Sequence, residues 1–275
     1  MWVDTASGLA VDIAKASGAR FGPEPAALYD AWPDFVGWAA TVTPDFAADG
    51  TPFVASEADA PSPAPRQVFA IGLNYKDHAD ESGFSYPPVP TVFTKFVGSF
   101  AGPEGTLVLP NDTVDWEAEL VVVIGRPAKD VARADAWEYV AGLTVGQDYS
   151  ERTLQLSGPA PQFSLGKSYP GFAPQGPYLT TVDELAEPAD LEIACTVNGE
   201  QVQGSRTSRL IFDIPTLIEH LSGVVQLYPG DVIFTGTPAG VGGAREPKWF
   251  LKDGDVVETT IEGLGSLRQT CASQR

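Results

Sequence analysis

The chain is poor in basic residues. Its 275 residues include 17 Lys and Arg against 36 Asp and Glu, which gives a formal net charge of −19 at pH 7. A surface of this sign repels nucleic acid phosphates and anionic lipid head groups, so we expect neither as a partner. An anionic substrate would also be repelled. Any site for such a substrate must therefore be locally positive, through a metal ion or buried Lys and Arg.

Cysteines and long apolar runs are also scarce. Cys195 and Cys271 lie far apart and in no metal-ligand spacing, which favours a reducing compartment over a disulfide-stapled secreted domain. No apolar run reaches the roughly 18 residues that a membrane helix needs. The N-terminal sequence MWVDTASGLAVDIAKASGAR has no basic region followed by an apolar run, as a leader would. We therefore expect a soluble, cytoplasmic protein.

A Pro-, Ala- and acid-rich stretch divides the chain. Residues 55–65 read ASEADAPSPAP, a composition that cannot bury apolar surface and predicts an extended linker. We expect a small N-terminal domain with its linker over residues 1–64 and a second domain over residues 65–275. The second domain has at least seven short apolar runs bounded by Gly and Pro, and few helical patterns, chiefly 134–140 and 213–221 with a short turn at 76–82. This predicts a mainly β fold with a few helices (α+β), as a barrel or sandwich.

Two glutamates stand at the start of the strongest strand pattern, DWEAELVVVIG. Glu117 and Glu119 are two residues apart, so on a strand both side chains point to one face. Like charges side by side repel unless a cation lies between them, and hard ions such as Mg²⁺ or Mn²⁺ take oxygen ligands. Asp148, which follows the run YVAGLTVGQ, is our candidate third ligand. The spacing alone also fits the solvent face of an edge strand.

A histidine and a glutamate three residues apart are candidates for a general base. His78 and Glu81 would share a face of a helical turn, and a carboxylate bonded to one imidazole nitrogen leaves the other free to take a proton. The pair also fits an ordinary solvated turn. His220 lies in an amphipathic pattern and is expected to be structural.

Three further segments carry polar candidates. Lys167 lies in FSLGKSYPGF with no acidic residue within ten positions, where it could neutralise a substrate carboxylate or an oxyanion, although a surface lysine fits equally. Arg152 and Gln155 follow Asp148 closely and could add polar contacts. The segment TGTPAGVGG, which contains Thr237, could cradle an anion with hydroxyl and N–H groups, or form a plain turn.

Taken together, IGLNYKDHADESG, DWEAELVVVIG, GQDYSERTLQ, GKSY, VNGE and YPGDVIFTGTPAGVG resemble, in this order, the fumarylacetoacetate hydrolase family. The resemblance runs from about Val68 to Thr270. The closing KWFLKDGDVVETTIEGLGS is most similar to the branch of 2,4-diketo-3-deoxy-L-rhamnonate hydrolases and acylpyruvases. It implies a mixed β-roll catalytic domain, a smaller N-terminal domain and a homodimer.

The resemblance also implies a role for each candidate residue. The implied metal ligands, with Mg²⁺ or Mn²⁺ as the ion, are Glu117, Glu119 and Asp148. The implied catalytic residues are His78, Glu81 and Lys167. The implied contacts to substrate or oxyanion, besides Lys167, come from Arg152, Gln155 and Thr237.

These residues predict cleavage of the C3–C4 bond of a 2,4-dioxo acid of the acylpyruvate type. His78 would activate a water that attacks C4, and the metal and Lys167 would stabilise the pyruvate enolate that leaves. The products would be pyruvate and a carboxylic acid. Oxaloacetate decarboxylation, keto–enol tautomerisation and hydration of a 2-oxo-alkenoate use the same site and stay open. A noncatalytic, metal-stabilised scaffold that binds small acids is the alternative outside enzymes.

Overall fold

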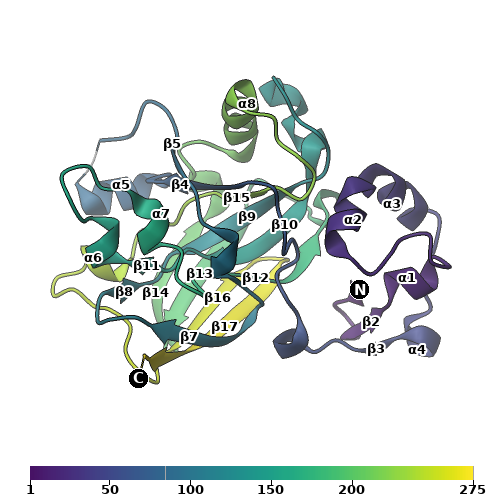
Figure 1. Ribbon diagram of the computed structural model, residues 1–275, viewed down its shortest axis with the longest axis horizontal. Helices are drawn as coiled ribbons and strands as arrows, with labels where there is room; N and C mark the ends of the chain where they lie inside the picture. The colour runs from purple at the N-terminus through teal and green to yellow at the C-terminus, as the bar shows by residue number, and fades with distance from the viewer. Residues whose placement is uncertain (84, 275) are drawn as a thin grey trace.

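The computed structural model describes residues 1–83 and 85–274, and two large sheets form most of it (Figure 1). The larger sheet has seven strands in the order β5-β4-β15-β9-β10-β12-β6. Their bounds are Thr91–Phe93, Val68–Gly72, Val232–Phe234, Ala118–Ile124, Val140–Gln147, Ala173–Thr180 and Phe100–Ala101. The sheet is mixed: β15 pairs parallel to β4 and antiparallel to β9, while β9 and β10 are antiparallel.

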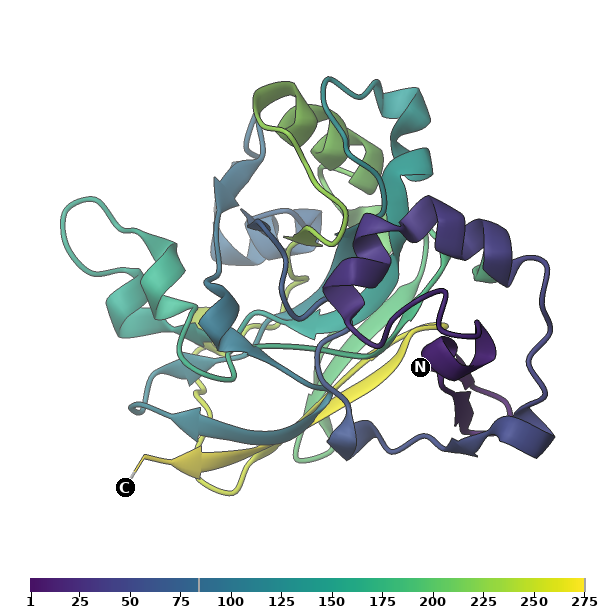
Figure 2. The same ribbon diagram turned by 45° about the vertical axis from the view of Figure 1, so that its right-hand side comes forward.

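The second sheet has five strands in the order β14-β13-β16-β17-β7. Their bounds are Glu200–Arg206, Glu192–Val197, Val256–Ile261, Gly265–Ser273 and Glu104–Leu109. A two-stranded ribbon pairs β8 (Val114–Asp115), which precedes β9 in the chain, with β11 (Ser150–Glu151), which follows β10. The sheets curl around a shared core, so the expected mainly β, mixed β-roll architecture is confirmed (Figure 2).

Strand β9 is buried on both faces along its whole length, which its unbroken apolar run VVVI requires. Alternate residues divide between two clusters. Leu120 and Val122 belong to the main core between the sheets, with Ile193 of β13. Val121 and Val123 belong to a second cluster on the opposite face. Glu119 has the register of Val121 and Val123 and therefore faces away from the main core.

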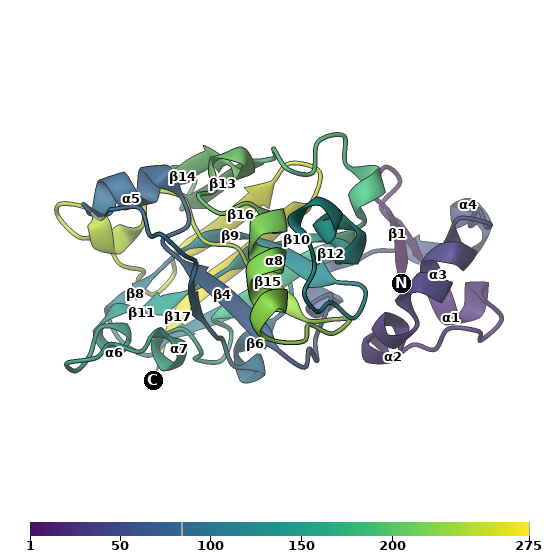
Figure 3. The ribbon, with the colours of Figure 1, turned by 90° about the horizontal axis from the view of Figure 1, so that it is seen from above.

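The helices are short and lie outside the sheets. Those of the larger part are α5 (Lys76–Ser82), α6 (Arg152–Gln155), α7 (Phe163–Gly166) and α8 (Ile214–Val224), with 3₁₀ turns at Val97–Ser99, Arg133–Tyr139, Val182–Glu184, Thr207–Arg209 and Gly242–Ala244. All three predicted helical segments are confirmed, the segment at 134–140 as a 3₁₀ helix. Helix α8 begins after Asp213, whose side chain caps Thr216 N–H, and it lies over the larger sheet (Figure 3).

The N-terminal residues form a lobe at one side of the molecule (Figure 1), and its Tyr29 and Trp32 pack in the same buried cluster as Val121 and Val123. It contains the small sheet β1 (Trp2–Asp4), β2 (Leu9–Val11) and β3 (Thr51–Pro52). Its helices are α1 (Ile13–Ala16), α2 (Pro25–Asp30), α3 (Trp32–Ala39) and α4 (Phe46–Asp49), and a 3₁₀ turn at Ala55–Glu57 opens the linker. The domain boundary after residue 64 stays a prediction.

The linker packs more closely than its composition indicated. Ala60 and Ser62 are only 4% and 2% exposed. The Ser62 hydroxyl donates to Gly230 O at 2.6 Å, and the Tyr29 hydroxyl donates to Pro61 O at 3.1 Å. The expectation that this stretch cannot bury apolar surface was wrong at Ala60, and the polar groups of Pro61 and Ser62 are paired with the rest of the protein. No helix in the described part of the chain is both long and apolar enough to span a membrane.

Candidate active site

The site is built where β9 begins and β10 ends. Glu117 lies between β8 and β9, Glu119 is the second residue of β9, and Asp148 follows β10. Gln147 Oε1 accepts the Glu117 N–H at 2.8 Å, and the Asp148 N–H donates to Glu117 O at 2.9 Å. Antiparallel pairing therefore brings carboxylates 29 to 31 positions apart in the chain to one place.

The three carboxylates form a buried cluster. The side chains of Glu117, Glu119 and Asp148 each offer an oxygen, and these oxygens all lie within 4.8 Å of one another. The residues are 7%, 1% and 0% exposed. The edge-strand alternative for Glu117 and Glu119 is wrong, because both are inside the protein.

The electrostatics of the cluster favour a bound cation. Burial, together with the charges of Asp148 and Glu117, raises the pKa of Glu119 well above its usual value. Burial acts the same way on Glu117, but Lys167 and Arg152 outweigh it and hold the pKa of Glu117 below its usual range. An all-oxygen set of this kind suits Mg²⁺ or Mn²⁺, and a divalent ion would remove the repulsion that Glu119 experiences. The residues thus fit the predicted metal.

Three cations surround the cluster. Lys167 Nζ lies 2.7 Å from Glu117 Oε2 and 2.6 Å from Asp148 Oδ2. Arg152 Nη1 lies 2.7 Å from Glu117 Oε1. Lys95 Nζ lies 2.5 Å from Asp148 Oδ1, and burial lowers the pKa of this lysine. The site therefore contains the buried Lys and Arg that we expected around a binding site for an anionic substrate in a chain of this net charge.

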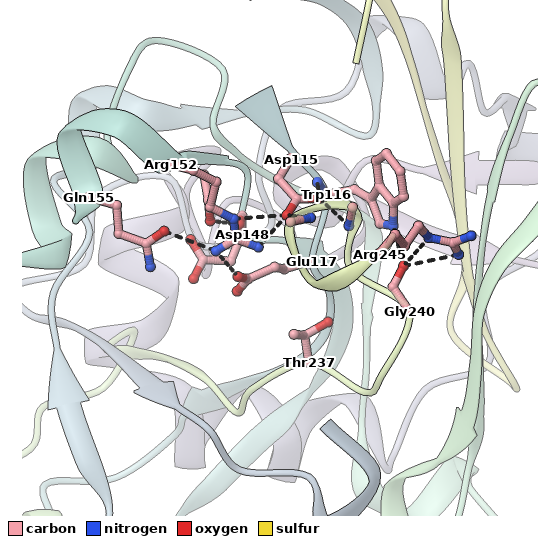
Figure 4. Close-up of polar contacts among 12 residues, drawn as sticks. Asp115, Trp116, Glu117, Asp148, Arg152, Gln155, Thr237, Gly240 and Arg245 are labelled. Atoms are coloured by element: carbon pink, nitrogen blue, oxygen red, sulfur yellow. Dashed lines mark hydrogen bonds and ion pairs between the residues drawn. The ribbon is translucent and has the colours of Figure 1, made fainter. Parts of the chain in front are cut away.

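Asp115 holds the guanidinium of Arg152 in place. Arg152 donates to Asp115 Oδ2 from Nε at 2.8 Å and from Nη2 at 2.6 Å, and from Nη1 to Gln155 Oε1 at 2.9 Å. Figure 4 shows Arg152 between Asp115, Glu117 and Gln155. The predicted polar pair Arg152 and Gln155 is therefore assembled beside the carboxylates.

The segment TGTPAGVGG binds anions, but these anions are carboxylates of the chain itself. Gly236 N–H donates to Glu119 Oε2 at 2.7 Å. Gly242 and Gly243 N–H donate to Asp115 at 2.7 and 2.8 Å. Thr237 is 4% exposed, and its hydroxyl accepts from Gln203 Nε2 at 2.8 Å. The segment thereby connects Asp115, Glu119 and Thr237 in one scaffold.

His78 and Glu81 meet on helix α5 as predicted. His78 Nδ1 lies 3.4 Å from Glu81 Oε2, and the side chains are 13% and 23% exposed. Gly240 N–H donates to both Glu81 oxygens at 3.1 and 3.0 Å. Burial works against the Glu81 charge, but the bonds from His78 and Gly240 outweigh it and hold its pKa below the usual range.

Sequence reasoning missed the buried ion pairs of Lys95 with Asp148 and of Asp115 with Arg152. Lys95 and Asp115 are fully buried charges, with 1% and 0% exposure. The available signals were an acid two residues before Glu117 and a lysine inside the apolar run PTVFTKF. Neither signal could identify the ion-pair partner of the residue, because both partners come from distant parts of the chain.

The model of the fumarylacetoacetate (FAA) hydrolase C-terminal family matches residues 67–272. The chain belongs to the fumarylacetoacetate hydrolase family. Among curated relatives, the "Fumarylacetoacetate hydrolase domain-containing protein 2 homolog" of Dictyostelium discoideum is 48% identical over 214 residues, which cover 74% of this chain and 70% of that protein. The mitochondrial oxaloacetate tautomerase Fahd2a of Rattus norvegicus is 46% identical over 208 residues, which cover 75% of this chain and 66% of that protein. The chain thus spans about two thirds of the length of these relatives.

Solved structures of the family share the fold. A Mycobacterium smegmatis protein named after HpcE is 56% identical, with a TM-score of 0.92, over 96% of this chain and 94% of its own. The fumarylpyruvate hydrolase of Pseudomonas aeruginosa, in complex with Mn²⁺ and pyruvate, is 32% identical, with a TM-score of 0.68, over 76% of this chain and 91% of its own. The chain is therefore an enzyme of a family that contains hydrolases and isomerases.

Proposed function

We propose that the enzyme acts on a 2-oxo acid whose C3 lies between two carbonyl groups, and that the reaction passes through the C2–C3 enolate. The observation that carries this proposal is the cluster of Glu117, Glu119 and Asp148 with Lys167 beside it. Mg²⁺ or Mn²⁺ held by the three carboxylates would supply a Lewis acid for the C1 carboxylate and C2 oxygen of such a substrate. Lys167 would stabilise the negative charge that develops on the substrate oxygen.

His78 is the proposed base. Glu81, fixed by the Gly240 N–H, holds one imidazole nitrogen and leaves the other free to take a proton. Arg152 and Gln155 would orient the substrate, and Thr237 would contact it from the segment TGTPAGVGG.

Two reactions use this arrangement. In keto–enol tautomerisation, the base takes a proton from C3 and the C2 oxygen receives one, so no bond between heavy atoms changes. In acylpyruvate hydrolysis, the base takes a proton from water, the hydroxide attacks C4, the C3–C4 bond breaks, and C3 is protonated to give pyruvate and a carboxylic acid. We rank tautomerisation of oxaloacetate first, because the oxaloacetate tautomerase of Rattus norvegicus is 46% identical to this chain over 208 residues, whereas the fumarylpyruvate hydrolase is 32% identical.

The test is a substrate panel with the metal-depleted enzyme, with Mg²⁺ or Mn²⁺ restored, and with EDTA. Enol-oxaloacetate decay is followed by ultraviolet absorbance, and pyruvate release is followed for oxaloacetate, acetylpyruvate and fumarylpyruvate. Metal-dependent decay without pyruvate supports the tautomerase. Metal-dependent pyruvate release from an acylpyruvate supports the hydrolase, and release from oxaloacetate alone would indicate decarboxylation. Silence on every compound would contradict the proposal, and a loss of stability on addition of EDTA would then favour the metal-stabilised scaffold.

We also propose a homodimer. Strand β5 is an edge of the seven-stranded sheet, and the residues around it expose a run of apolar side chains. These are Val89, Val92, Phe96 and Val97, with exposures of 57%, 42%, 51% and 41%. An edge strand can pair with its own copy about a twofold axis, because such an interface is self-complementary. Light scattering should report a dimer for the wild type and a monomer for Phe96→Asp, while Val224→Asp, at an exposed position of α8, should stay dimeric.

A further inference from the structure

Lys95 is a buried lysine on an otherwise exposed segment. It follows the edge strand β5 and is 1% exposed, whereas its neighbours Phe96 and Val97 are 51% and 41% exposed. Its chain therefore points inward while theirs point outward. A lysine is almost never fully buried unless it is paired, so its partners inside the protein are informative.

Both partners of Lys95 belong to the active site. Its Nζ lies 2.5 Å from Asp148 Oδ1, and it also donates to the backbone carbonyl of Lys167. The second oxygen of Asp148 takes Lys167 Nζ at 2.6 Å. Both partners of Lys95 are acceptors, so its nitrogen is a donor to each. Each oxygen of Asp148 thus faces a different ammonium group.

The balance of buried charge gives this arrangement a consequence. Four carboxylates, those of Asp115, Glu117, Glu119 and Asp148, face the three cations Lys95, Lys167 and Arg152. When all four carboxylates are ionised, as a bound divalent ion would make them, one negative charge is left over. With a divalent ion bound, the net charge of these groups and the ion becomes one positive charge. Without Lys95 the loaded site would be neutral.

We infer that Lys95 sets the charge of the site, so that the metal-loaded centre is cationic and binds anionic 2-oxo acids at the cost of some affinity for the metal. This inference rests on the proposed function. It makes a paired prediction: neutralising Lys95 strengthens metal binding and weakens binding of the anionic ligand. Damage to the structure would weaken both, so the opposite signs identify a charge effect.

The experiment uses calorimetric titrations of wild type and Lys95→Gln, whose amide keeps two donors without the charge. Mn²⁺ is titrated into the metal-free protein, and oxalate, a dianion with the adjacent oxygen pair of a 2-oxo acid, into the Mn²⁺-saturated protein. Loss of a unit charge a few ångströms away should lower the Kd for Mn²⁺ and raise the Kd for oxalate, each by about tenfold or more. Lys129→Gln is the control, because Lys129 also contacts a carboxylate and backbone carbonyls, at Asp130, Ser222 and Gly223, but lies at the surface.

Each outcome decides the inference. Opposite shifts in Lys95→Gln, with none in Lys129→Gln, support it. Weaker binding of both ligands, or no change in either, overturns it. If Lys95→Gln does not fold, the same titrations are made with Lys95→Met, which has a similar aliphatic chain. Failure of both variants to fold would show that Lys95 has a structural role and would also overturn the inference. Absence of oxalate binding to the Mn²⁺-loaded wild type would instead contradict the proposed function.

Discussion

Asp115→Asn should destabilise the protein strongly, although the two side chains have nearly the same shape. Asp115 is 0% exposed and only accepts hydrogen bonds. Oδ1 takes the N–H groups of Trp116 and Gly242, and Oδ2 takes the Gly243 N–H and two bonds from Arg152. An amide nitrogen at either position would face only donors, and the Arg152 guanidinium would lose its main counter-ion.

The expected size follows from the burial of this pair. Breaking a buried ion pair on one side costs about 3–5 kcal/mol, because the remaining charge is left without a partner. For a protein of this size that corresponds to a fall in Tm of about 6–20 °C. Urea unfolding followed by tryptophan fluorescence and calorimetry would measure it. The control is Glu258→Gln, which breaks the exposed ion pair with Arg268 and should move the midpoint little. A loss for Asp115→Asn no larger than that of the control would refute the argument.

Three further predictions concern the base and its support. His78→Gln should lower kcat by about 10²–10⁴-fold, as expected for loss of a general base, while the calorimetric Kd for Mn²⁺ stays unchanged; unchanged turnover would exclude His78 as the base. The pKa of Glu81 lies below its usual value of 4.5, so its carboxylate stabilises the fold above that pH and loses this effect as the pH falls through the folded pKa. The stability difference between wild type and Glu81→Gln should therefore narrow below pH 4.5 in urea titrations, and a gap independent of pH would contradict this. Gly240→Ala should cost about 1–3 kcal/mol or more, because Gly240 has a φ of +108° and an added Cβ would lie 2.0 Å from Val202 O. Gly223→Ala, in α8 with open space around it, is the matched control and should be neutral or stabilising in the same assay.

Several parts of the site follow from local sequence alone. The two-residue spacing of Glu117 and Glu119 at the start of an apolar run requires a shared face on any strand. The three-residue spacing of His78 and Glu81 brings them together on any helical turn. The structure agrees with both, since α5 and β9 have the predicted form. Short-range geometry is set by backbone periodicity, so these contacts could be predicted without knowledge of the fold.

Other parts depend on which distant segments become neighbours. The pairing of β9 with β10 decides that Asp148 joins the glutamates, and the path of the chain after β5 decides that Lys95 reaches Asp148. The N–H groups of Gly236 and Gly242 point at carboxylates more than 110 positions away. A local sequence pattern cannot predict contacts between segments that are so far apart in the chain.

The sequence by itself therefore predicted the carboxylate cluster and the pair of His78 and Glu81, through local spacing together with the family resemblance. It also predicted the mainly β class, through its many short apolar runs bounded by Gly and Pro. Only the tertiary structure decided that the glutamates are buried, that Asp115 holds Arg152, and that Lys95 offsets one buried carboxylate charge. The physical reason is that burial and charge balance are properties of the surroundings in space, and in a sheet those surroundings come from strands far apart in the chain.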